Sequence, residues 1–241
     1  MSQYEKYYNS FYRELAEIDE RCNRLKKISR FLPELSPGAR VLDIGCGHGS
    51  VSSGLVTMGL RVYGMEINTE ALISLQRRGI IPVEHDITQP FPKMEPFDLV
   101  LLLDVLEHVF DPLALMEQAA QTLTQTGKMI IVVPLYFDLI DRLHILFTGR
   151  IVSYDNHCYG QKLYRRFRSY NYDHIRFFSP RDVLELCRLV GLKVDLVEYS
   201  PLSAAYLGRV VERLVKIVAN RMTVNFLPSL LSHSMIVRVQ R

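Results

Sequence analysis

The chain has 241 residues, of which 48% are hydrophobic and 23% charged, with a formal net charge of +3. These proportions are ordinary for a soluble globular protein, and this length suits one domain with a sizeable core. So small a charge does not by itself indicate nucleic-acid binding. MSQYEKYYNS lacks the apolar stretch of a secretory signal, and the longest apolar run, MIIVVPLYF, is too short to span a bilayer. The four scattered cysteines argue against a structural zinc site and favour a reducing, cytoplasmic location.

The N-terminal stretch has the spacing of an amphipathic helix. Its apolar residues recur at alternating steps of four and three: Tyr4, Tyr8, Phe11, Leu15, Ile18, Cys22 and Leu25. A coiled coil would need more repeats, so we expect this face to pack onto the rest of the chain. The chain is therefore divided into an N-terminal helical segment, 1–37, and a main domain, 38–241.

Strand-like runs alternate with helical segments from residue 40 onward. The runs cover residues 40–44, 61–66, 80–85, 97–103 and 128–133. The helical segments between them open at Ser50, at Asn68 and after the pair Asp111-Pro112. Because the runs are almost continuously apolar, the strands are expected to be buried on both faces of a parallel sheet. This alternation predicts a doubly wound α/β fold.

The alternation is interrupted twice in the second half. A cap insertion at about 135–178 is rich in Tyr, Phe and Arg and has no clean period. A helix then begins at Ser179 as N-cap and ends at Gly191, and residues 192–200 read as a strand. A helical insertion at about 201–232 follows, with one basic amphipathic helix expected over 202–222, and SMIVRVQR predicts a last strand.

A glycine loop follows the first expected strand, in the sequence VLDIGCGHGS at residues 41–50. Its spacing, GxGxG, matches neither the dinucleotide fingerprint GxGxxG nor a phosphate-binding loop with its Lys-Ser/Thr pair. Asp43 stands two residues before the first glycine, where a carboxylate would repel a pyrophosphate. It would instead attract a cationic ligand such as S-adenosylmethionine, which carries an ammonium and a sulfonium. This spacing therefore argues against an NAD-dependent enzyme.

Two further acids end the next two expected strands. Glu66 lies 21 residues after Gly45, about where nucleotide-binding α/β folds place a carboxylate on ribose hydroxyls. Asp86 follows the third run and could accept a hydrogen bond from an adenine amino group. Acids at three successive strand ends along one sheet edge indicate a nucleoside-type ligand more strongly than any one of them does.

The motifs VLDIGCGHGS, YGMEIN, HDITQPFP and FDLVLLLDVLEHVFDP, in this order, resemble those of class I S-adenosylmethionine-dependent methyltransferases. The resemblance covers roughly residues 38–200 and is nearest to the group that contains ubiquinone-type O-methyltransferases and related small-molecule enzymes. It implies a Rossmann-like, seven-stranded, mostly parallel sheet with an antiparallel last strand. The helical insertion before that strand departs from the minimal family pattern.

The resemblance also implies which residues bind the cofactor S-adenosylmethionine. They are Asp43, Gly45, Cys46, Gly47, Glu66, Ile67, Asp86, Ile87 and Asp104. The glycine loop would line the methionine moiety and Glu66 the ribose diol. Ile67, Asp86 and Ile87 would surround the adenine, and Asp104 would begin the loop beneath the sulfonium.

Two histidines are candidates for the chemistry. Methyl transfer from a sulfonium is an in-line displacement in which positioning supplies much of the rate, so no catalytic residue is obligatory. A hydroxyl acceptor would gain from a general base, for which histidine is suited. His108 in LEHVFDP and His174 in NYDHIRFFSP are the candidates, and each also has a purely structural interpretation. No metal site is expected.

The cap concentrates positive charge. Residues 149–181 hold seven Lys/Arg and two Asp, whereas the whole chain sums to +3. With interleaved Tyr and Phe, this pattern fits RNA stacking, an anionic small-molecule acceptor, or solvated arginines with no direct role. Nucleic acid is the least favoured of these partners.

The basic amphipathic stretch within 207–222 also has several interpretations. Such a helix can lie on a membrane surface, bury its face against its own domain, or meet a second subunit. For the whole chain we expect methyl transfer from S-adenosylmethionine to a small molecule, at oxygen. The alternatives are an RNA or protein methyltransferase and a non-catalytic methyltransferase-like module that regulates a partner.

Overall fold

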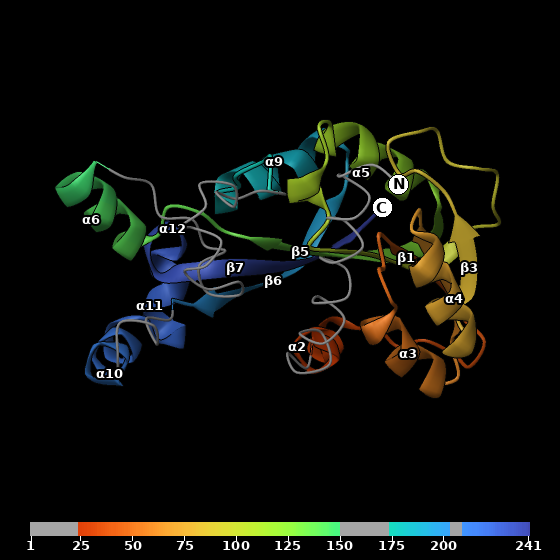
Figure 1. The fold of residues 1–241 in the computed structure, drawn as a ribbon, viewed down its shortest axis with the longest axis horizontal. Helices are drawn as coiled ribbons and strands as arrows, with labels where there is room; N and C mark the ends of the chain where they lie inside the picture. Colours follow the sequence, from red (N-terminus) through yellow and green to blue (C-terminus); the bar gives the residue numbers. More distant parts are fainter. Residues whose placement is uncertain (1–23, 150–173, 203–208) are drawn as a thin grey trace.

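The computed structural model describes residues 24–149, 174–202 and 209–241 (Figure 1). The expected helical face from Tyr4 to Cys22 lies outside these residues. So do the basic residues of the cap between 150 and 168 and the start of the expected helix over 202–222. Within the described residues, no helix combines the length and apolar character needed to cross a bilayer.

Seven strands form a single sheet in the order β3-β2-β1-β4-β5-β7-β6. Their bounds are β1 (Arg40–Ile44), β2 (Arg61–Glu66), β3 (Ile81–Glu84), β4 (Phe97–Leu103), β5 (Leu123–Pro134), β6 (Lys193–Pro201) and β7 (Ser232–Gln240). Strands β1 to β5 are parallel, and β7 pairs antiparallel with both β5 and β6. The predicted doubly wound α/β fold with an antiparallel last strand is confirmed.

Helices cover both faces of the sheet (Figure 1). α5 (Pro112–Gln121) and α9 (Pro180–Leu189) pack on one face, while α2 (Arg24–Ile28), α3 (Ser50–Thr57) and α4 (Thr69–Arg77) pack on the other. The central strand β4 is continuously apolar because its alternate side chains enter two different hydrophobic cores. Val100 and Leu102 belong to the first core, and Leu99 and Leu101 to the second, all fully buried.

The predicted helix starts are confirmed by their caps. Asn68 accepts a hydrogen bond from the Ala71 N–H at 2.9 Å, and Asp111 accepts one from the Ala114 N–H at 2.9 Å. Ser179 forms a capping box with Asp182 at the start of α9. These side chains fix the residue at which each helix begins.

The described part of the N-terminal segment packs onto the domain, as expected. It contains α2 and a short 3₁₀ helix, η1 (Ser29–Phe31), and the side chains of Ile28 and Phe31 are buried in the core beneath α3. Leu25 of α2 lies directly over Gly54 of α3, where a Cβ would come within 2.1 Å of Leu25 Cδ2. The absence of a side chain at position 54 lets Leu25 pack directly on the backbone of α3.

A helical lobe extends one end of the sheet, opposite α3 and α4 (Figure 1). We use "helical lobe" for α6 (Leu139–Thr148), α10 (Arg209–Val218), α11 (Arg221–Phe226) and α12 (Pro228–Leu231). They surround a small core of Leu202, Ala219, Val224 and Leu231. The single helix expected over 202–222 is wrong, because α10 ends at Val218 and Asn220 caps the separate helix α11 with its side chain.

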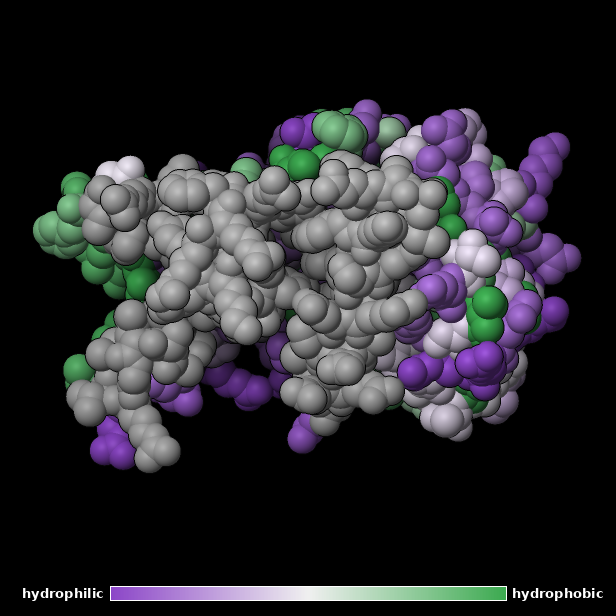
Figure 2. Space-filling model, viewed as in Figure 1, coloured by the Kyte–Doolittle hydropathy of each residue, from purple (hydrophilic) through white to green (hydrophobic). Residues whose placement is uncertain are grey.

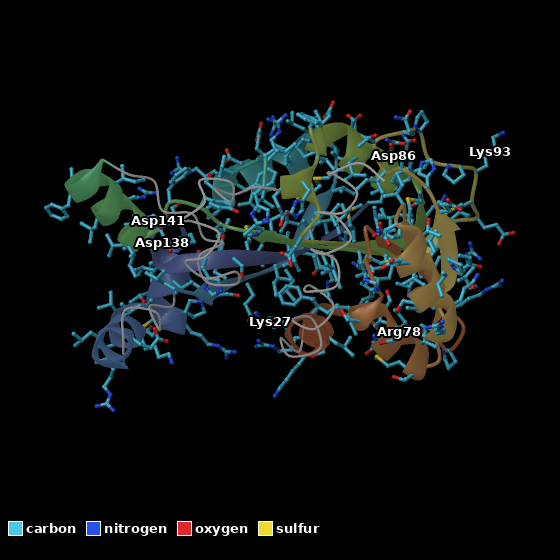
Figure 3. All side chains as sticks on the ribbon, viewed as in Figure 1. Lys27, Arg78, Asp86, Lys93, Asp138 and Asp141 are labelled. Atoms are coloured by element: carbon cyan, nitrogen blue, oxygen red, sulfur yellow. The ribbon has the colours of Figure 1, made fainter. Side chains whose placement is uncertain are left out.

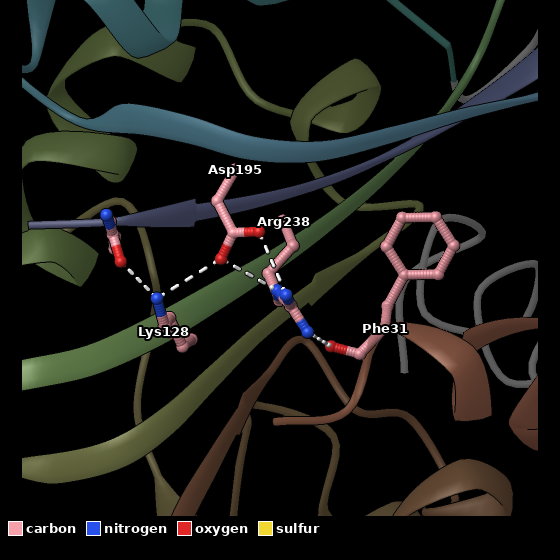
Figure 4. Close-up of polar contacts among 5 residues, drawn as sticks. Phe31, Lys128, Asp195 and Arg238 are labelled. Atoms are coloured by element: carbon pink, nitrogen blue, oxygen red, sulfur yellow. Dashed lines mark hydrogen bonds and ion pairs between the residues drawn. The ribbon is translucent and has the colours of Figure 1, made fainter. Parts of the chain in front are cut away.

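The three strands at the antiparallel edge are joined by a charged network (Figure 4). Asp195 of β6 accepts two hydrogen bonds from the guanidinium of Arg238 on β7, at 3.0 and 2.9 Å. It also pairs with Lys128 of β5 at 3.1 Å, while Arg238 donates to the Phe31 carbonyl at 3.1 Å. The bond from Arg238, then the one from Lys128, holds the pKa of Asp195 below its usual range. The network thus fastens the sheet edge to the N-terminal segment.

Replacing Asp195 should weaken this edge. We expect Asp195→Ala to lower the free energy of unfolding by about 1–2 kcal/mol, since it leaves two partly buried cations without their shared acceptor. Because the folded-state pKa is depressed, the contribution is present above pH 3.8 and is lost as the pH falls through the folded value. Urea denaturation followed by circular dichroism measures it. Glu185→Ala, which removes the exposed pair with Arg188, is the control and should leave the midpoint unchanged.

Two buried aspartates begin the helical lobe. Asp138 caps α6 by accepting from the N–H groups of Ile140 and Asp141. Burial, and next the nearby carboxylate of Asp138, raise the pKa of Asp141 to about 7. The folded chain therefore holds a proton on Asp141 at pH values where the unfolded chain does not.

This proton makes stability depend on pH in a predictable direction. Because the folded pKa of Asp141 lies above its unfolded value of 3.8, its contribution is full below that value and is lost as pH rises toward about 7. We expect Asp141→Asn, which stays neutral, to remove this part of the slope. Thermal melts at about pH 5 and about pH 8 measure it. Parallel curves for the two proteins would show that Asp141 ionises normally.

Candidate functional site

The glycine loop forms a tight backbone turn between β1 and α3. Gly45, Gly47 and Gly49 all have positive φ values, of 65°, 53° and 74°. At Gly49 a Cβ would also lie 2.5 Å from Ile80 Cδ1 and 2.6 Å from Leu75 Cδ2. The loop therefore requires glycine for its conformation, and at position 49 also for close packing. The N–H groups of Gly45 and Gly49 donate to the carbonyls of Met65 and Cys46, at 2.9 and 3.0 Å, so backbone hydrogen bonds fix the turn ahead of α3.

Glu66 holds this loop in shape. Its side chain is buried at the end of β2, with an exposed fraction of 4%. One carboxylate oxygen accepts from the Gly47 N–H at 3.0 Å, and the other from the N–H groups of Ile67 and Asn68 at 2.8 and 3.0 Å. A single carboxylate thus links the glycine loop to the turn that begins α4. Oε1 already accepts two of these bonds, so the remaining acceptor capacity for a ligand hydroxyl lies on Oε2.

The side chains of Asp43 and Cys46 pack beneath the glycine loop. Asp43 is buried, and its Oδ2 accepts from the Ser52 hydroxyl of α3 at 2.6 Å. The Sγ of Cys46 lies against β2, within 2.7 Å of where a Cβ on Gly64 would be. Burial, then the carboxylates of Asp43 and Glu66, raises the pKa of the Cys46 thiol well above its usual value. Cys46 is therefore kept as a neutral thiol that packs against the sheet.

The third predicted acid lies beyond β3. Asp86 is partly exposed and accepts from both the N–H and the hydroxyl of Thr88, at 2.9 and 2.7 Å. These bonds lower the pKa of Asp86. Figure 3 shows Asp86 at the end of the molecule opposite the helical lobe, and Ile87 beside it packs against the core. Ile67, at the start of the neighbouring turn, leaves 58% of its surface exposed, as expected for a residue available to a flat ligand.

The loop after β4 packs directly on the glycine loop. Asp104 has a left-handed backbone, with φ of 55°, and its N–H donates to the Val132 carbonyl at 2.9 Å. The next residue, Val105, is buried and would lie 3.0 Å from a Cβ on Gly45. This contact brings the chain carrying His108 against the first glycine of the loop. The predicted residues at the ends of β1, β2 and β4 therefore meet along one sheet edge.

The two candidate histidines lie side by side. The ring centroids of His108 and His174 are 4.6 Å apart, although 66 residues separate them in the sequence. Glu107 is fully buried beside them, with Oε1 3.9 Å from His108 Nε2. Its backbone carbonyl accepts from the N–H groups of Ile175 and Arg176, at 2.8 and 3.1 Å. These two bonds fasten the segment that carries His174 to the loop after β4.

Tyr136 completes the cluster. Its hydroxyl contacts His174 Nδ1, and its ring packs edge-on against Phe177 with centroids 4.9 Å apart. Phe137 follows with a positive φ of 62°, 6.0 Å from the Phe177 ring. Sequence reasoning missed both Tyr136 and Glu107. The sequence shows Glu107 next to His108, but no pattern of neighbouring residues predicts that Glu107 is buried. Nor does any predict that Tyr136 contacts a histidine 38 positions away.

The cluster has the composition of a possible cation site. The ligand atoms of Glu107, His108 and His174 all lie within 4.8 Å of one another, and in the described part of the chain this is the one group of its kind. One carboxylate and two imidazoles suit a first-row transition metal. The same three groups suit proton transfer, so the geometry leaves both chemistries available at the edge where the cofactor loop lies.

This combination of fold and loop defines a class I S-adenosylmethionine-dependent methyltransferase: a seven-stranded sheet with one antiparallel strand, and a glycine loop facing acids instead of phosphate-binding groups. Residues 8–197 match the family described as "Methyltransferase domain", and the chain belongs to that family. Its cofactor is S-adenosylmethionine, and it is an enzyme of the transferase class.

Individual relatives agree with this assignment. The chain is 29% identical over 176 residues to a ubiquinone biosynthesis O-methyltransferase of Paraburkholderia phymatum, covering 69% of this chain and 71% of that one. It is 30% identical over 181 residues to the enzyme of that name from Cupriavidus pinatubonensis, covering 70% and 67%. A crystal structure of a SAM-dependent methyltransferase from Archaeoglobus fulgidus has the same fold, with a TM-score of 0.61 at 16% identity, over 94% and 98% of the two chains.

The loop geometry predicts that Glu66 is needed for cofactor binding. Glu66→Ala would release three backbone N–H groups that set the shape of the loop and the adjoining turn. We expect S-adenosylhomocysteine to bind at least about ten-fold more weakly, measured by isothermal titration calorimetry. The control is Glu84→Ala, at the paired position on β3, where the side chain is exposed. Equal affinity of the two variants for S-adenosylhomocysteine would show that Glu66 is not needed for cofactor binding.

Proposed function

We propose that the chain transfers the methyl group of S-adenosylmethionine to an oxygen of a small-molecule acceptor. The observation that carries this proposal is the pair of adjacent imidazoles, His108 and His174, beside the buried Glu107. His108 and Glu107 lie on the loop that packs against Gly45. An oxygen acceptor must lose a proton as the methyl group arrives, and a base in this place can take it. The names of the curated relatives also support oxygen as the acceptor atom.

The residues of the cluster would have distinct roles. His108 is the better candidate for the base, because its side chain keeps 32% of its surface exposed while the contact with Tyr136 orients His174. The buried carboxylate of Glu107 would stabilise the imidazolium once the proton has moved. The cofactor, when bound, supplies the activated methyl group, and the chain's task is then orientation and proton removal.

The cofactor contacts follow the same geometry. We propose that Asp43, Gly45, Cys46 and Gly47 form the surface for the methionine moiety, Cys46 through its backbone. Glu66 would face the ribose hydroxyls, with one acceptor site remaining on Oε2. The adenine would lie between Ile67 and the pair Asp86 and Ile87, and Asp104 would approach the sulfonium side. The buried carboxylates along this edge support a cationic ligand over a pyrophosphate.

Aromatic side chains around the histidines favour an acceptor with an apolar or aromatic body. Phe137 and Phe177 keep 36% and 45% of their surfaces exposed beside Tyr136, and Phe110 keeps 78%. Arg176 reaches back to the Phe110 carbonyl and adds a cation beside these rings. An acidic phenol or a hydroxylated aromatic carboxylate would match both features.

The base assignment is tested by methyl transfer to a panel of phenols and aromatic carboxylates, followed by mass spectrometry of the product. We expect His108→Gln to lower kcat by about 10²–10⁴-fold, with S-adenosylhomocysteine binding unchanged. His233→Gln is the control, since His233 contacts the Pro201 carbonyl at 2.7 Å in the β6–β7 ladder. An unchanged kcat in His108→Gln would contradict the proposal.

The same assay distinguishes the alternatives. Loss of activity on treatment with a chelator, restored by a divalent ion, would assign the cluster to metal binding. Turnover of RNA with a steep fall at rising salt would favour a nucleic-acid substrate. Cofactor binding without turnover of any acceptor, together with a co-purifying partner, would favour a non-catalytic regulatory module.

A further inference from the structure

The helical lobe carries a concentration of exposed apolar side chains. Half of the exposed large apolar residues that the structure describes lie in it or at its α11–α12 junction, the rest being scattered over the domain. They are Leu143, Leu146, Phe147, Leu214, Ile217, Val218, Met222, Phe226 and Leu227. Phe147 and Phe226 leave 81% and 80% of their surfaces exposed. Figure 2 shows the hydrophobic colour gathered over α6 at this end of the molecule.

These side chains are not a poorly packed core. The lobe already has an interior, in which Val215 of α10 and Leu139 of α6 pack against Ala219 and Val224. The exposed residues lie on the other faces of the same helices, so the sequence supplies one apolar set for the interior and a second for the outside. A concentration of exposed apolar side chains at one end of a molecule is typical of an interaction site.

The charges of the lobe are segregated in the same way. Its acids are withdrawn from solvent: Asp138 and Asp141 are buried, and Glu212 leaves only 14% of its side chain exposed. Its cations remain at the surface, with Arg213, Lys216 and Arg221 all exposed. The outward face of the lobe is thus apolar and cationic together.

We propose that the helical lobe binds to the surface of an anionic lipid bilayer, with α6, α10 and α11 lying in the headgroup region. Apolar side chains would enter the acyl boundary while the neighbouring cations meet lipid phosphates, as in other interfacial amphipathic helices. The charge pattern favours lipid over a second copy of the chain. A two-fold interface would gather the exposed cations of both copies in one patch, while Asp138 and Asp141 are buried and Glu212 is already paired with Lys216 of its own helix at 2.9 Å.

The test is co-sedimentation of the full chain with vesicles of phosphatidylcholine alone and of phosphatidylcholine mixed with phosphatidylglycerol. We expect binding to the mixed vesicles, weakened by salt. Ile217→Glu and Phe147→Glu should each reduce vesicle binding by about ten-fold, because each substitution removes one apolar side chain that would enter the bilayer. Lys216→Gln should reduce binding to the mixed vesicles more than binding to phosphatidylcholine.

Ile73→Glu on α4 is the matched control, since Ile73 is also exposed, at 46%, but lies at the other end of the molecule. It should bind vesicles like the unmodified chain. Unchanged S-adenosylhomocysteine binding in every variant shows that the fold is intact and separates this result from the proposed function. The proposal is overturned if no vesicle is bound, if Ile73→Glu is as damaging as Ile217→Glu, or if light scattering shows a dimer that Ile217→Glu dissociates while vesicles remain unbound.

Discussion

The carboxylate of Glu66 is the constraint on which the cofactor site depends. Three backbone N–H groups from two separate turns converge on it, so the glycine loop and the start of α4 cannot move independently. A buried carboxylate is costly unless its oxygens are satisfied, and here the backbone satisfies them. The positive φ values of the glycines provide the curvature that this convergence needs. Glu66 thus orders the loop, and its place at the end of β2 follows from parallel pairing with β1.

Residue patterns were sufficient to predict the sheet and its edge. Continuous apolar runs such as FDLVLLL fit one environment only, a strand covered on both faces, and Asn68, Asp111 and Ser179 marked the helix starts through local hydrogen bonds. Both signals act over a few residues, so they can be seen without the tertiary structure. The acids at successive strand ends could be placed together for the same reason, since parallel strands deliver them to one edge.

What escaped prediction depends on contacts distant in sequence or on competition between local signals. Tyr136 meets His174, and the carbonyl of Glu107 binds the backbone of Ile175, through tertiary packing of the cap that no local pattern specifies. The apolar spacing of the last helical segment suggested one helix over 202–222. Asn220 ended it, because its side chain offers the backbone a cap for a new helix. The position of the Cys46 sulfur likewise depends on a distant residue, since the lack of a side chain at Gly64 gives it a site against the sheet.

Three consecutive residues join the histidine pair to α6 of the helical lobe. The Tyr136 hydroxyl contacts His174, Phe137 takes a left-handed conformation, and Asp138 caps α6. The helix that would enter the headgroup region therefore begins three residues after the one that touches the histidine pair. The rings of Phe137 and Phe177 keep part of their surfaces exposed along this connection. An acceptor with an apolar body would partition into the same bilayer that the helical lobe contacts. Its hydroxyl would then need to move only along this short aromatic segment to reach His108.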